Sequence, residues 1–470
     1  MDTPWLGDAS SLLDAYRSGE VDPVEATEAS IRAIEASSLN AISHLDAERA
    51  LDAARRADPS LPLGGLPLGI KELDHVGGWP ANEASLALEG TIAEGDSPLN
   101  ERLRSAGAIL LAQTTSSEFG SVNFTSTRLH GTTTNPWDES RTPGGSSGGT
   151  AAAVAGGLLP LASGSDGGGS IRIPAGFTGL VGLKPSFGRI PKMTEASFEP
   201  LTSVWGCLSR SVRDTALFLD VAAGPDERDP FSLPAAPGSF LGDLGTTDLT
   251  GLRAAISIDL GAAIVAEDVA AHLEVAAVEL AQACGMTVVP LDLEFPEGGL
   301  EWSMVSSASV LADLGDRYPA CSDLLGPEMG FGARLTHKRF TLETLLAVER
   351  FRHAAVATMA TAFSQVDVII CATNPDVAFD AAGPMRMTVE GRDLVAEVGI
   401  GKALGNNGAL TIPANTTGNP AIALPAGTVR GLPVSLQVIG RHHAEQLLLD
   451  IGLVLERIAP WPLIAPGAPA

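Results

Sequence analysis

The chain has 470 residues, of which 45% are hydrophobic and 18% charged, and its net charge is −26. This length allows two or three domains or one large α/β domain, and core volume is not limiting. A nucleic-acid binder neutralises phosphates with clustered basic residues, and the acidic sequence contains no such cluster. We therefore expect a compact globular enzyme with no nucleic acid as partner.

The cysteines and the start of the chain indicate a compartment. Four widely spaced cysteines form no C-x-x-C pair, so the pattern predicts buried free thiols: Cys207, Cys284, Cys321 and Cys371. The first residues lack the basic and apolar regions of a signal peptide. Residues 151–162 form the longest small-apolar stretch and are too short to cross a bilayer. We expect a cytoplasmic protein with no membrane as partner.

The N-terminal part predicts helices followed by a strand. Residues 10–18 have the pattern of a short helix, and a second helix begins at Asp22, where Asp-Pro-Val-Glu combines an N-cap, a first-turn proline and the capping-box Glu25. Residues 66–73 alternate between apolar and polar, as a short strand entering a loop does. This pattern puts Lys71 at the end of a strand, among apolar neighbours.

Helices and strands then alternate along the chain. Helix and strand pairs are predicted at 98–106 with 108–112 and at 150–156 with 158–162. Later elements are a strand at 253–258, a helix at 267–283, a strand at 287–291, a helix at 341–363 and strands at 366–370, 421–424 and 431–440. Such alternation predicts a mixed or parallel sheet with helices on its faces.

Two later segments show no such pattern. Residues 224–250, rich in Pro, Gly and Asp, are the best candidate for a boundary. Residues 293–340 have no clear period and are expected to be irregular. They hold four large apolar residues that hint at an aryl or alkyl substrate group: Trp302, Met304, Met329 and Phe331.

Two glycine-rich segments, residues 142–150 and 164–174, each contain serine and are the strongest candidates for chemistry. Glycine lets a backbone come close to a bound group. The first segment contains Gly144-x-Ser146-x-Gly148, the pattern of a nucleophile elbow, but no strand precedes it and no histidine has a catalytic context. Neither segment ends in Gly-Lys-Ser/Thr, which argues against a phosphate loop. Tight turns without chemistry remain the structural alternative.

The pattern as a whole resembles the amidase signature family. Six segments carry the resemblance: 69–72, 142–150, 164–174, 179–189, 415–425 and 431–440. The resemblance is specific between 140 and 190 and loose between 225 and 365. It implies one α/β domain over 1–470, with a central mixed β-sheet covered by helices on both faces, a signature core at 66–190 and a variable, substrate-shaping region at 293–340.

The family hydrolyses carboxamides with a Ser-Ser-Lys triad, and the matching positions are Ser170 as nucleophile, Ser146 as proton relay and Lys71 as base. In the family the relay serine follows a cis peptide bond, here Gly145–Ser146. A serine hydroxyl is a weak nucleophile until a base takes its proton. Lysine can be that base when burial lowers the pKa of its ammonium group, and the apolar neighbours of Lys71 favour burial.

The resemblance also assigns an oxyanion hole and supporting residues. Backbone amides of Gly167, Gly168 and Gly169, with that of Ser170, would form the hole, and their placement matters for the rate. The supporting residues would be Ser147, Ser165, Asp166 and Arg172. Of these, Asp166 and Arg172 are interpreted mainly as structural.

The sequence departs from the family at two positions. Glu72 replaces the usual Asp, and its charge would favour the protonated form of Lys71. Gly167 replaces the usual Thr or Ile and adds backbone freedom in the loop, so that either neighbours hold the loop or activity is lowered.

The sequence thus predicts an amidase that needs no cofactor or metal and turns a small-molecule amide into an acid plus ammonia or an amine. Three further residues are candidates to line its pocket: His75, Trp79 and Asn123. A homodimer is compatible with the resemblance. Two alternatives stay open: the glutamine-hydrolysing A subunit of a tRNA-dependent amidotransferase, and a catalytically silent binding protein on the same fold.

Overall fold

One large sheet runs through the computed structural model, which describes residues 3–192, 201–296 and 299–468. Its strands are β1 (Ile42–Leu45), β2 (Pro67–Lys71), β3 (Ile109–Thr114), β6 (Leu161–Asp166), β7 (Val181–Lys184), β8 (Val204–Ser209), β9 (Arg253–Ile256), β10 (Thr287–Val288), β11 (Val368–Ala372), β14 (Ala421–Val429) and β15 (Leu432–Gly440). They form an eleven-stranded sheet in the order β1-β3-β2-β6-β8-β7-β14-β15-β11-β9-β10. Two small hairpins lie outside it: β4 (Ser126–Thr127) with β5 (Gly131–Thr132), and β12 (Thr388–Val389) with β13 (Arg392–Asp393).

The sheet is mixed, as the sequence predicts. β2 is parallel to both β3 and β6, whereas β8 is antiparallel to β6 and β7. On the far side, β15 is antiparallel to β14 and β11, and β9 is parallel to β11. Because β9 and β10 join the same sheet, residues 224–250 do not divide the fold into two domains.

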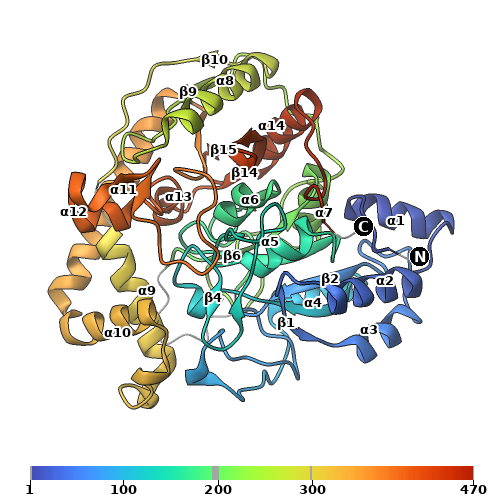
Figure 1. The fold of residues 1–470 in the computed structure, drawn as a ribbon. Helices are drawn as coiled ribbons and strands as arrows, with labels where there is room; N and C mark the ends of the chain where they lie inside the picture. Colours follow the sequence, from blue (N-terminus) through green and yellow to red (C-terminus); the bar gives the residue numbers. More distant parts are fainter. Residues whose placement is uncertain (1–2, 193–200, 297–298, 469–470) are drawn as a thin grey trace.

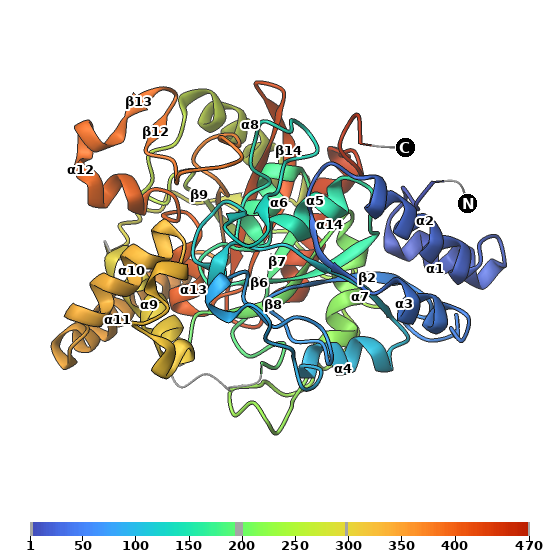
Figure 2. The same cartoon turned by 60° about the horizontal axis from the view of Figure 1, so that its bottom comes forward.

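Helices cover both faces of this sheet (Figures 1 and 2). α5 (Gly148–Ala155) and α6 (Arg172–Thr178) pack on one face, and α7 (Val212–Ala222), α8 (Glu267–Ala283) and α14 (Glu445–Ile458) pack on the other. Two consecutive residues of β8 point to opposite faces: Leu208 joins the cluster that contains Ala151 of α5, and Cys207 faces Thr215 of α7. All four cysteines are buried free thiols, which confirms the prediction.

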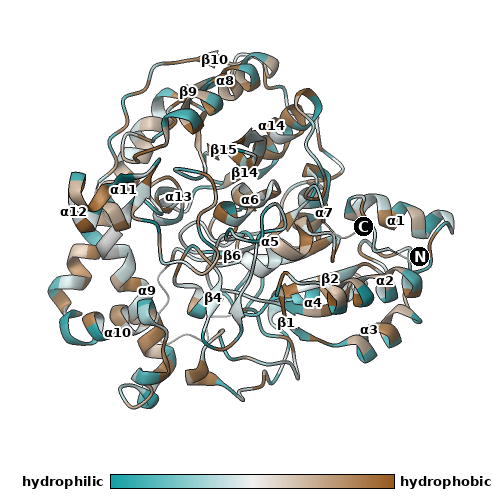
Figure 3. Cartoon of the chain, viewed as in Figure 1, coloured by the Kyte–Doolittle hydropathy of each residue, from teal (hydrophilic) through white to brown (hydrophobic). Residues whose placement is uncertain are grey.

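Three of the four N-terminal helices match helices that the sequence predicts, and the exception is the helix at residues 47–54. The four helices are α1 (Ala9–Ser18), α2 (Pro23–Ala36), α3 (Ala47–Ala54) and α4 (Pro98–Ser105). The Asp22 side chain accepts a hydrogen bond from the Val24 amide, and Glu25 completes the capping box. In Figure 3 the outer helices α3 and α4 show both hydrophilic and hydrophobic turns, as expected of helices packed on one side.

The prediction that residues 293–340 are irregular is wrong. They form α9 (Gly299–Leu314) and α10 (Pro327–Arg339), which lie beside α11 (Leu342–Gln365) in both views of the chain (Figures 1 and 2). Within this region, residues 297 and 298 lie outside the described residues. The buried positions of α10 are mostly small, which hides the helical period: Met329, Gly330, Ala333 and Thr336. Two further helices, α12 (Leu394–Gly405) and α13 (Ile412–Thr417), follow β11.

Two boundaries near the glycine-rich segments also differ from the prediction. Strand β6 extends to Asp166 rather than ending at Ala162, so Ser165 and Asp166 are strand residues. Helix α5 begins at Gly148, inside the first glycine-rich segment. Over the described part of the chain, no helix combines the length and apolar character needed to span a bilayer.

Candidate active site

Lys71 is the last residue of β2, a strand that is buried throughout. Leu68 and Ile70 fill the core, and the Lys71 amide donates to the Ser163 hydroxyl of β6 at 3.0 Å. The strand therefore delivers a fully buried lysine to the carboxyl end of the central strands, as the sequence predicts.

The Lys71 ammonium group contacts two serine hydroxyls. Its Nζ lies 2.6 Å from Ser146 Oγ and 2.9 Å from Ser165 Oγ. Burial lowers the pKa of Lys71 from 10.5 to about 7, although the charges of Asp166, Glu72 and Glu83 act in the opposite direction. A substantial fraction of the amine is thus neutral near neutral pH and able to accept a proton.

Glu72 has partners of its own. Its Oε1 accepts from the Ser116 amide at 2.5 Å, and its Oε2 lies 2.9 Å from His130 Nε2. The carboxylate raises the pKa of Lys71, as the sequence suggests, but burial of Lys71 is the larger influence. The replacement of Asp by Glu at this position therefore leaves Lys71 able to lose its proton.

The first glycine-rich segment is a tightly packed turn that presents Ser146. A Cβ on Gly145 would lie 2.6 Å from the Phe124 amide and from the Val122 carbonyl, so only glycine fits there. The Gly145–Ser146 peptide bond is cis, as the resemblance implies. Ser146 is buried, and its carbonyl accepts from the Ser117 amide at 3.2 Å.

Ser170 follows β6 and precedes α6, and its side chain is half-buried. Its carbonyl accepts from the Ser147 amide at 3.3 Å, and the Ser147 hydroxyl donates to the Ser165 carbonyl at 3.3 Å, so Ser147 links the two serine segments. Within the described ranges the Ser170 hydroxyl makes no hydrogen bond. The structure thus brings Lys71 and Ser146 into contact, whereas a link from Ser146 to Ser170 stays a prediction.

Asp166 and Arg172 form a fully buried ion pair across the base of the Ser170 loop, at 2.8 Å. Burial alone would raise the pKa of Asp166, but Arg172, Asn415 and Lys184 outweigh it and hold the pKa well below its usual range. The remaining Arg172 hydrogen bonds are donated to the Thr411 carbonyl, Gln437 Oε1 and Asn415 Oδ1. These contacts match a bracing role for both residues, and they bury both charges with partners.

The Asp166 carboxylate also selects which loop amides are free. It accepts from the Gly169 amide at 2.8 Å and from the Ile171 amide at 3.1 Å. The Gly169 N–H is therefore not available to a substrate oxygen, which corrects its place in the predicted oxyanion hole. Among the residues described, the amides of Gly167, Gly168 and Ser170 have no acceptor.

Side chains from distant segments hold the outer side of this loop. The Trp302 indole N–H donates to the Gly167 carbonyl at 3.0 Å, and the Thr411 hydroxyl donates to the Gly168 carbonyl at 2.6 Å. Neither contact follows from the sequence, because Trp302 lies in a segment without clear period and Thr411 lies before the matched segment 415–425. Neighbours therefore hold the carbonyls of Gly167 and Gly168 in place, which is the first of the two outcomes expected for this loop.

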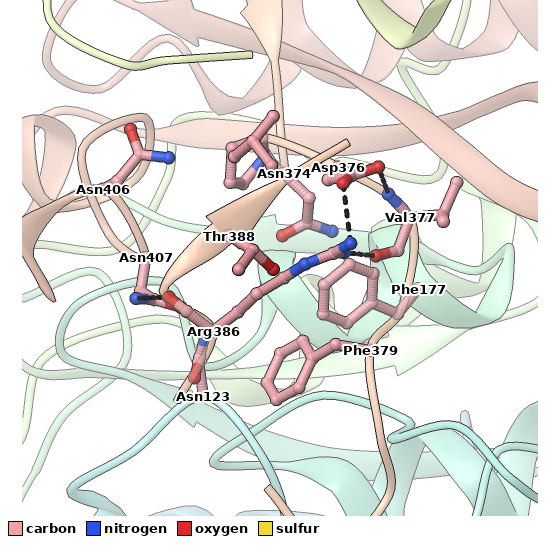
Figure 4. A pocket seen from close by; sticks show the side chains of 12 residues that line it. Asn123, Phe177, Asn374, Asp376, Val377, Phe379, Arg386, Thr388, Asn406 and Asn407 are labelled. Carbon is pink, nitrogen blue, oxygen red and sulfur yellow. Dashed lines mark hydrogen bonds and ion pairs between the residues drawn. The ribbon is translucent and has the colours of Figure 1, made fainter. Parts of the chain in front are cut away.

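The three further candidates for the pocket differ from one another. Trp79 is buried and donates from Nε1 to Asp46 Oδ2 at 2.8 Å, so it is a core residue rather than a pocket wall. His75 lies 3.4 Å from Glu83. Asn123 does line a cavity, which it shares with Phe177, Phe379 and Arg386 (Figure 4), and it donates to Asn407 Oδ1 at 3.0 Å.

The large apolar residues of 293–340 do not form one substrate wall. Met304 and Met329 are buried, and Met329 belongs to a separate small core between α9 and α10. Phe331 is 63% exposed. Trp302, in contrast, reaches the serine loops through its contact with Gly167.

Comparison with known proteins agrees with this geometry. The family model described as "Amidase" matches residues 25–449. An acylamidase from Rhodococcus erythropolis is 34% identical, over 97% of this chain and 96% of its own length. The A subunit of a glutamyl-tRNA(Gln) amidotransferase from Chloroflexus aggregans is 33% identical, over 96% of each chain. A bacterial aryl acylamidase superposes with a TM-score of 0.89 at 27% identity, covering 97% of each chain.

Proposed function

Because this chain belongs to the amidase signature family and is an amide-hydrolysing enzyme, we propose that Ser170, Ser146 and Lys71 carry out the hydrolysis. The observation that supports this assignment most strongly is the buried contact of 2.6 Å between Lys71 Nζ and Ser146 Oγ. A lysine with a pKa of about 7 beside a serine hydroxyl is a base with a proton donor in reach.

In the proposed acylation step, neutral Lys71 takes the Ser146 proton while Ser146 takes the proton of Ser170. The Ser170 oxygen attacks the amide carbon, and the C=O bond becomes a C–O⁻ oxyanion. The intermediate collapses when the C–N bond breaks, and the proton returns from Lys71 through Ser146 to the leaving nitrogen. The products of this step are an acyl-enzyme and ammonia or an amine.

Deacylation repeats the same proton path with water. A water molecule gives its proton through Ser146 to Lys71 and attacks the ester carbon, and the proton then returns to the Ser170 oxygen as it leaves. The carboxylic acid departs and the serine is restored. The free amides of Gly167, Gly168 and Ser170 are the donors we assign to the oxyanion in both steps.

The matched relatives support a small-molecule carboxamide as substrate. One is an acylamidase, another an aryl acylamidase, and a 6-aminohexanoate cyclic dimer hydrolase superposes with a TM-score of 0.85 at 27% identity, covering 98% of this chain and 99% of its own. We propose an acyl amide as the substrate class. The four buried thiols support a reducing, cytoplasmic setting.

A second candidate function rests on the similarity to the A subunit of the amidotransferase. In this alternative the same three residues hydrolyse glutamine and the ammonia passes to partner subunits. Assays for ammonia release separate the two functions. Turnover of acyl amides by the isolated chain supports a stand-alone amidase, and glutaminase activity that appears only with added amidotransferase subunits supports the alternative.

A fluorophosphonate probe tests the assignment of the nucleophile, because it forms a covalent bond with an activated serine. We expect the wild-type chain to be labelled and Ser170→Ala to lose the label and the turnover. Labelling that survives in Ser170→Ala but disappears in Ser146→Ala would reverse the roles of the two serines. Thermal unfolding of both variants checks that each one is folded.

A further inference from the structure

Trp302 of α9 lies directly against the loop that precedes Ser170. Its indole N–H donates to the Gly167 carbonyl at 3.0 Å. A Cβ on Gly168 would lie 2.5 Å from Trp302 Cζ2 and 3.0 Å from Cε2, so the indole ring occupies the space of a side chain at 168. Trp302 is itself partly buried.

The backbone conformation does not explain the glycine at 168. Neither Gly167 nor Gly168 has a positive φ, so an L-residue could adopt either conformation. At 167 the nearest atom to an added Cβ belongs to Ser203 at 3.7 Å, an ordinary contact. At 168, therefore, the side chain is excluded by the indole ring and not by the backbone.

The hydrogen bond from Trp302 acts on the amide that we assign to the oxyanion. The Gly167 carbonyl and the Gly168 N–H belong to one planar peptide unit, so a bond that fixes the carbonyl also fixes the direction of the N–H. A donor on the carbonyl also polarises the peptide and strengthens its N–H as a donor. In the next peptide unit Thr411 holds the Gly168 carbonyl, and the N–H is already bonded to Asp166.

Helix α9 is well anchored for this task. Met304 and Val305, two and three residues after Trp302, are buried, and Val310 and Leu314 pack in the small core that α9 shares with α10. A side chain on a fixed helix can hold a loop in place at little further entropic cost. The indole is thus presented by a rigid element rather than by another loop.

We propose that Trp302 is a positioning residue that aims the Gly168 amide at the substrate carbonyl oxygen, and that position 168 is glycine because the indole ring fills its side-chain space. This inference rests on the proposed function, since it needs the Gly168 amide to serve the oxyanion. It also gives the region 293–340 an indirect part in catalysis, through the Gly168 amide.

The first test compares two tryptophans that make the same kind of bond. Trp461 Nε1 donates to the Arg210 carbonyl at 3.0 Å and is likewise partly buried, but it lies near the C-terminus. We expect Trp302→Phe to lower kcat about tenfold, the effect of one lost hydrogen bond, with KM within about twofold. Trp461→Phe should leave both constants unchanged. An unchanged kcat in Trp302→Phe, or a rise in KM alone, would overturn the inference.

The second test is a double-mutant cycle with Gly168→Ala. In the wild-type background the added methyl meets the indole ring, and we expect kcat to fall about hundredfold as the loop shifts. In the Trp302→Ala background the space is open, so the same methyl group should lower kcat by less than about threefold. Equal costs of Gly168→Ala in both backgrounds would show that the glycine is not there for the indole.

The two proposals fail in different ways. If Ser170→Ala keeps wild-type turnover, the proposed nucleophile is wrong. If Ser170→Ala is inactive but Trp302→Phe and the double-mutant cycle show none of the expected effects, the nucleophile stands and the role of Trp302 is wrong.

Discussion

Lys71 and Lys184 end two strands of the same sheet, and both side chains are fully buried. Burial lowers the pKa of each from 10.5 to about 7; Arg172 adds to this effect at Lys184, and nearby carboxylates oppose it at both sites. The two lysines differ in their contacts. Lys71 Nζ touches the hydroxyls of Ser146 and Ser165, whereas Lys184 Nζ donates to the Pro185 carbonyl at 2.8 Å.

The difference shows what makes a buried lysine a base. A lowered pKa supplies a neutral amine, but a proton can reach that amine only from a donor. Ser146 is such a donor for Lys71, whereas the carbonyl beside Lys184 can only accept. A lowered pKa is therefore common to both lysines. The hydroxyl partner distinguishes Lys71, the proposed base, from Lys184, which is only packed in the core.

The largest effect is expected from the loss of the Lys71 amine. Replacing each lysine by methionine, a side chain of similar length without an amine, compares the two sites. Lys71→Met should lower kcat/KM by about 10⁴-fold or more, because the base and its relay act as one unit. Lys184→Met should keep the rate within about tenfold, because its amine accepts no proton in the reaction. Ammonia release from an amide panel measures both. Equal losses in the two variants would show that burial, and not the serine contact, decides the role.

The location of Lys71 could be predicted from the sequence because the signal is local. Alternation in 66–73 shows the strand end, and the matched segments give Ser146 and Ser170 their order. The bracing role of Asp166 and Arg172 follows from the same matched segments, but the distant partners of Arg172 could not be predicted in this way. Arg172 reaches the Thr411 carbonyl from 239 positions away, and only the folded sheet brings these segments together.

Helices α9 and α10 show a second reason for a missed prediction. Periodicity detects a helix when one stripe is large and apolar. The buried stripe of α10 includes Gly330, Ala333 and Thr336, so its contrast with the exposed side is weak. Trp302 lies on α9, in the same segment without a clear period, so its contact with Gly167 could not be predicted from the sequence.

The next expected effect concerns pH. Protonated Lys71 cannot take the Ser146 proton, so kcat/KM should rise about tenfold per pH unit up to the pKa of the base and then level off. The pKa of about 7 places this limb in the acidic range. Lys184→Met should show the same profile, since that amine is not the base. A wild-type profile that is flat between about pH 5 and 7 would contradict the assignment of Lys71.

A smaller effect is expected at Ser165, the other hydroxyl beside Lys71. A neutral amine that donates to Ser165 turns its lone pair toward Ser146, so the hydroxyl of Ser165 orients the base. Ser165→Ala should lower kcat about tenfold with little change in KM. Ser209→Ala is the control, because it removes a fully buried hydroxyl from β8, away from Lys71. Equal losses of kcat would point to general loosening of the sheet.

The smallest effect is one in which the two lysines should behave alike. Both have a folded-state pKa of about 7 and an ordinary value of 10.5, so between these values the unfolded chain binds more protons. The free energy of unfolding should therefore rise with pH through this range, and it should fall as pH drops toward 7. Lys71→Met and Lys184→Met should each flatten the rise by a similar amount, as measured by urea unfolding at several pH values. If the free energy of unfolding of one variant still rises with pH as in the wild type, the lysine replaced in that variant is not held neutral by burial. The two lysines would then differ in pKa as well as in their contacts.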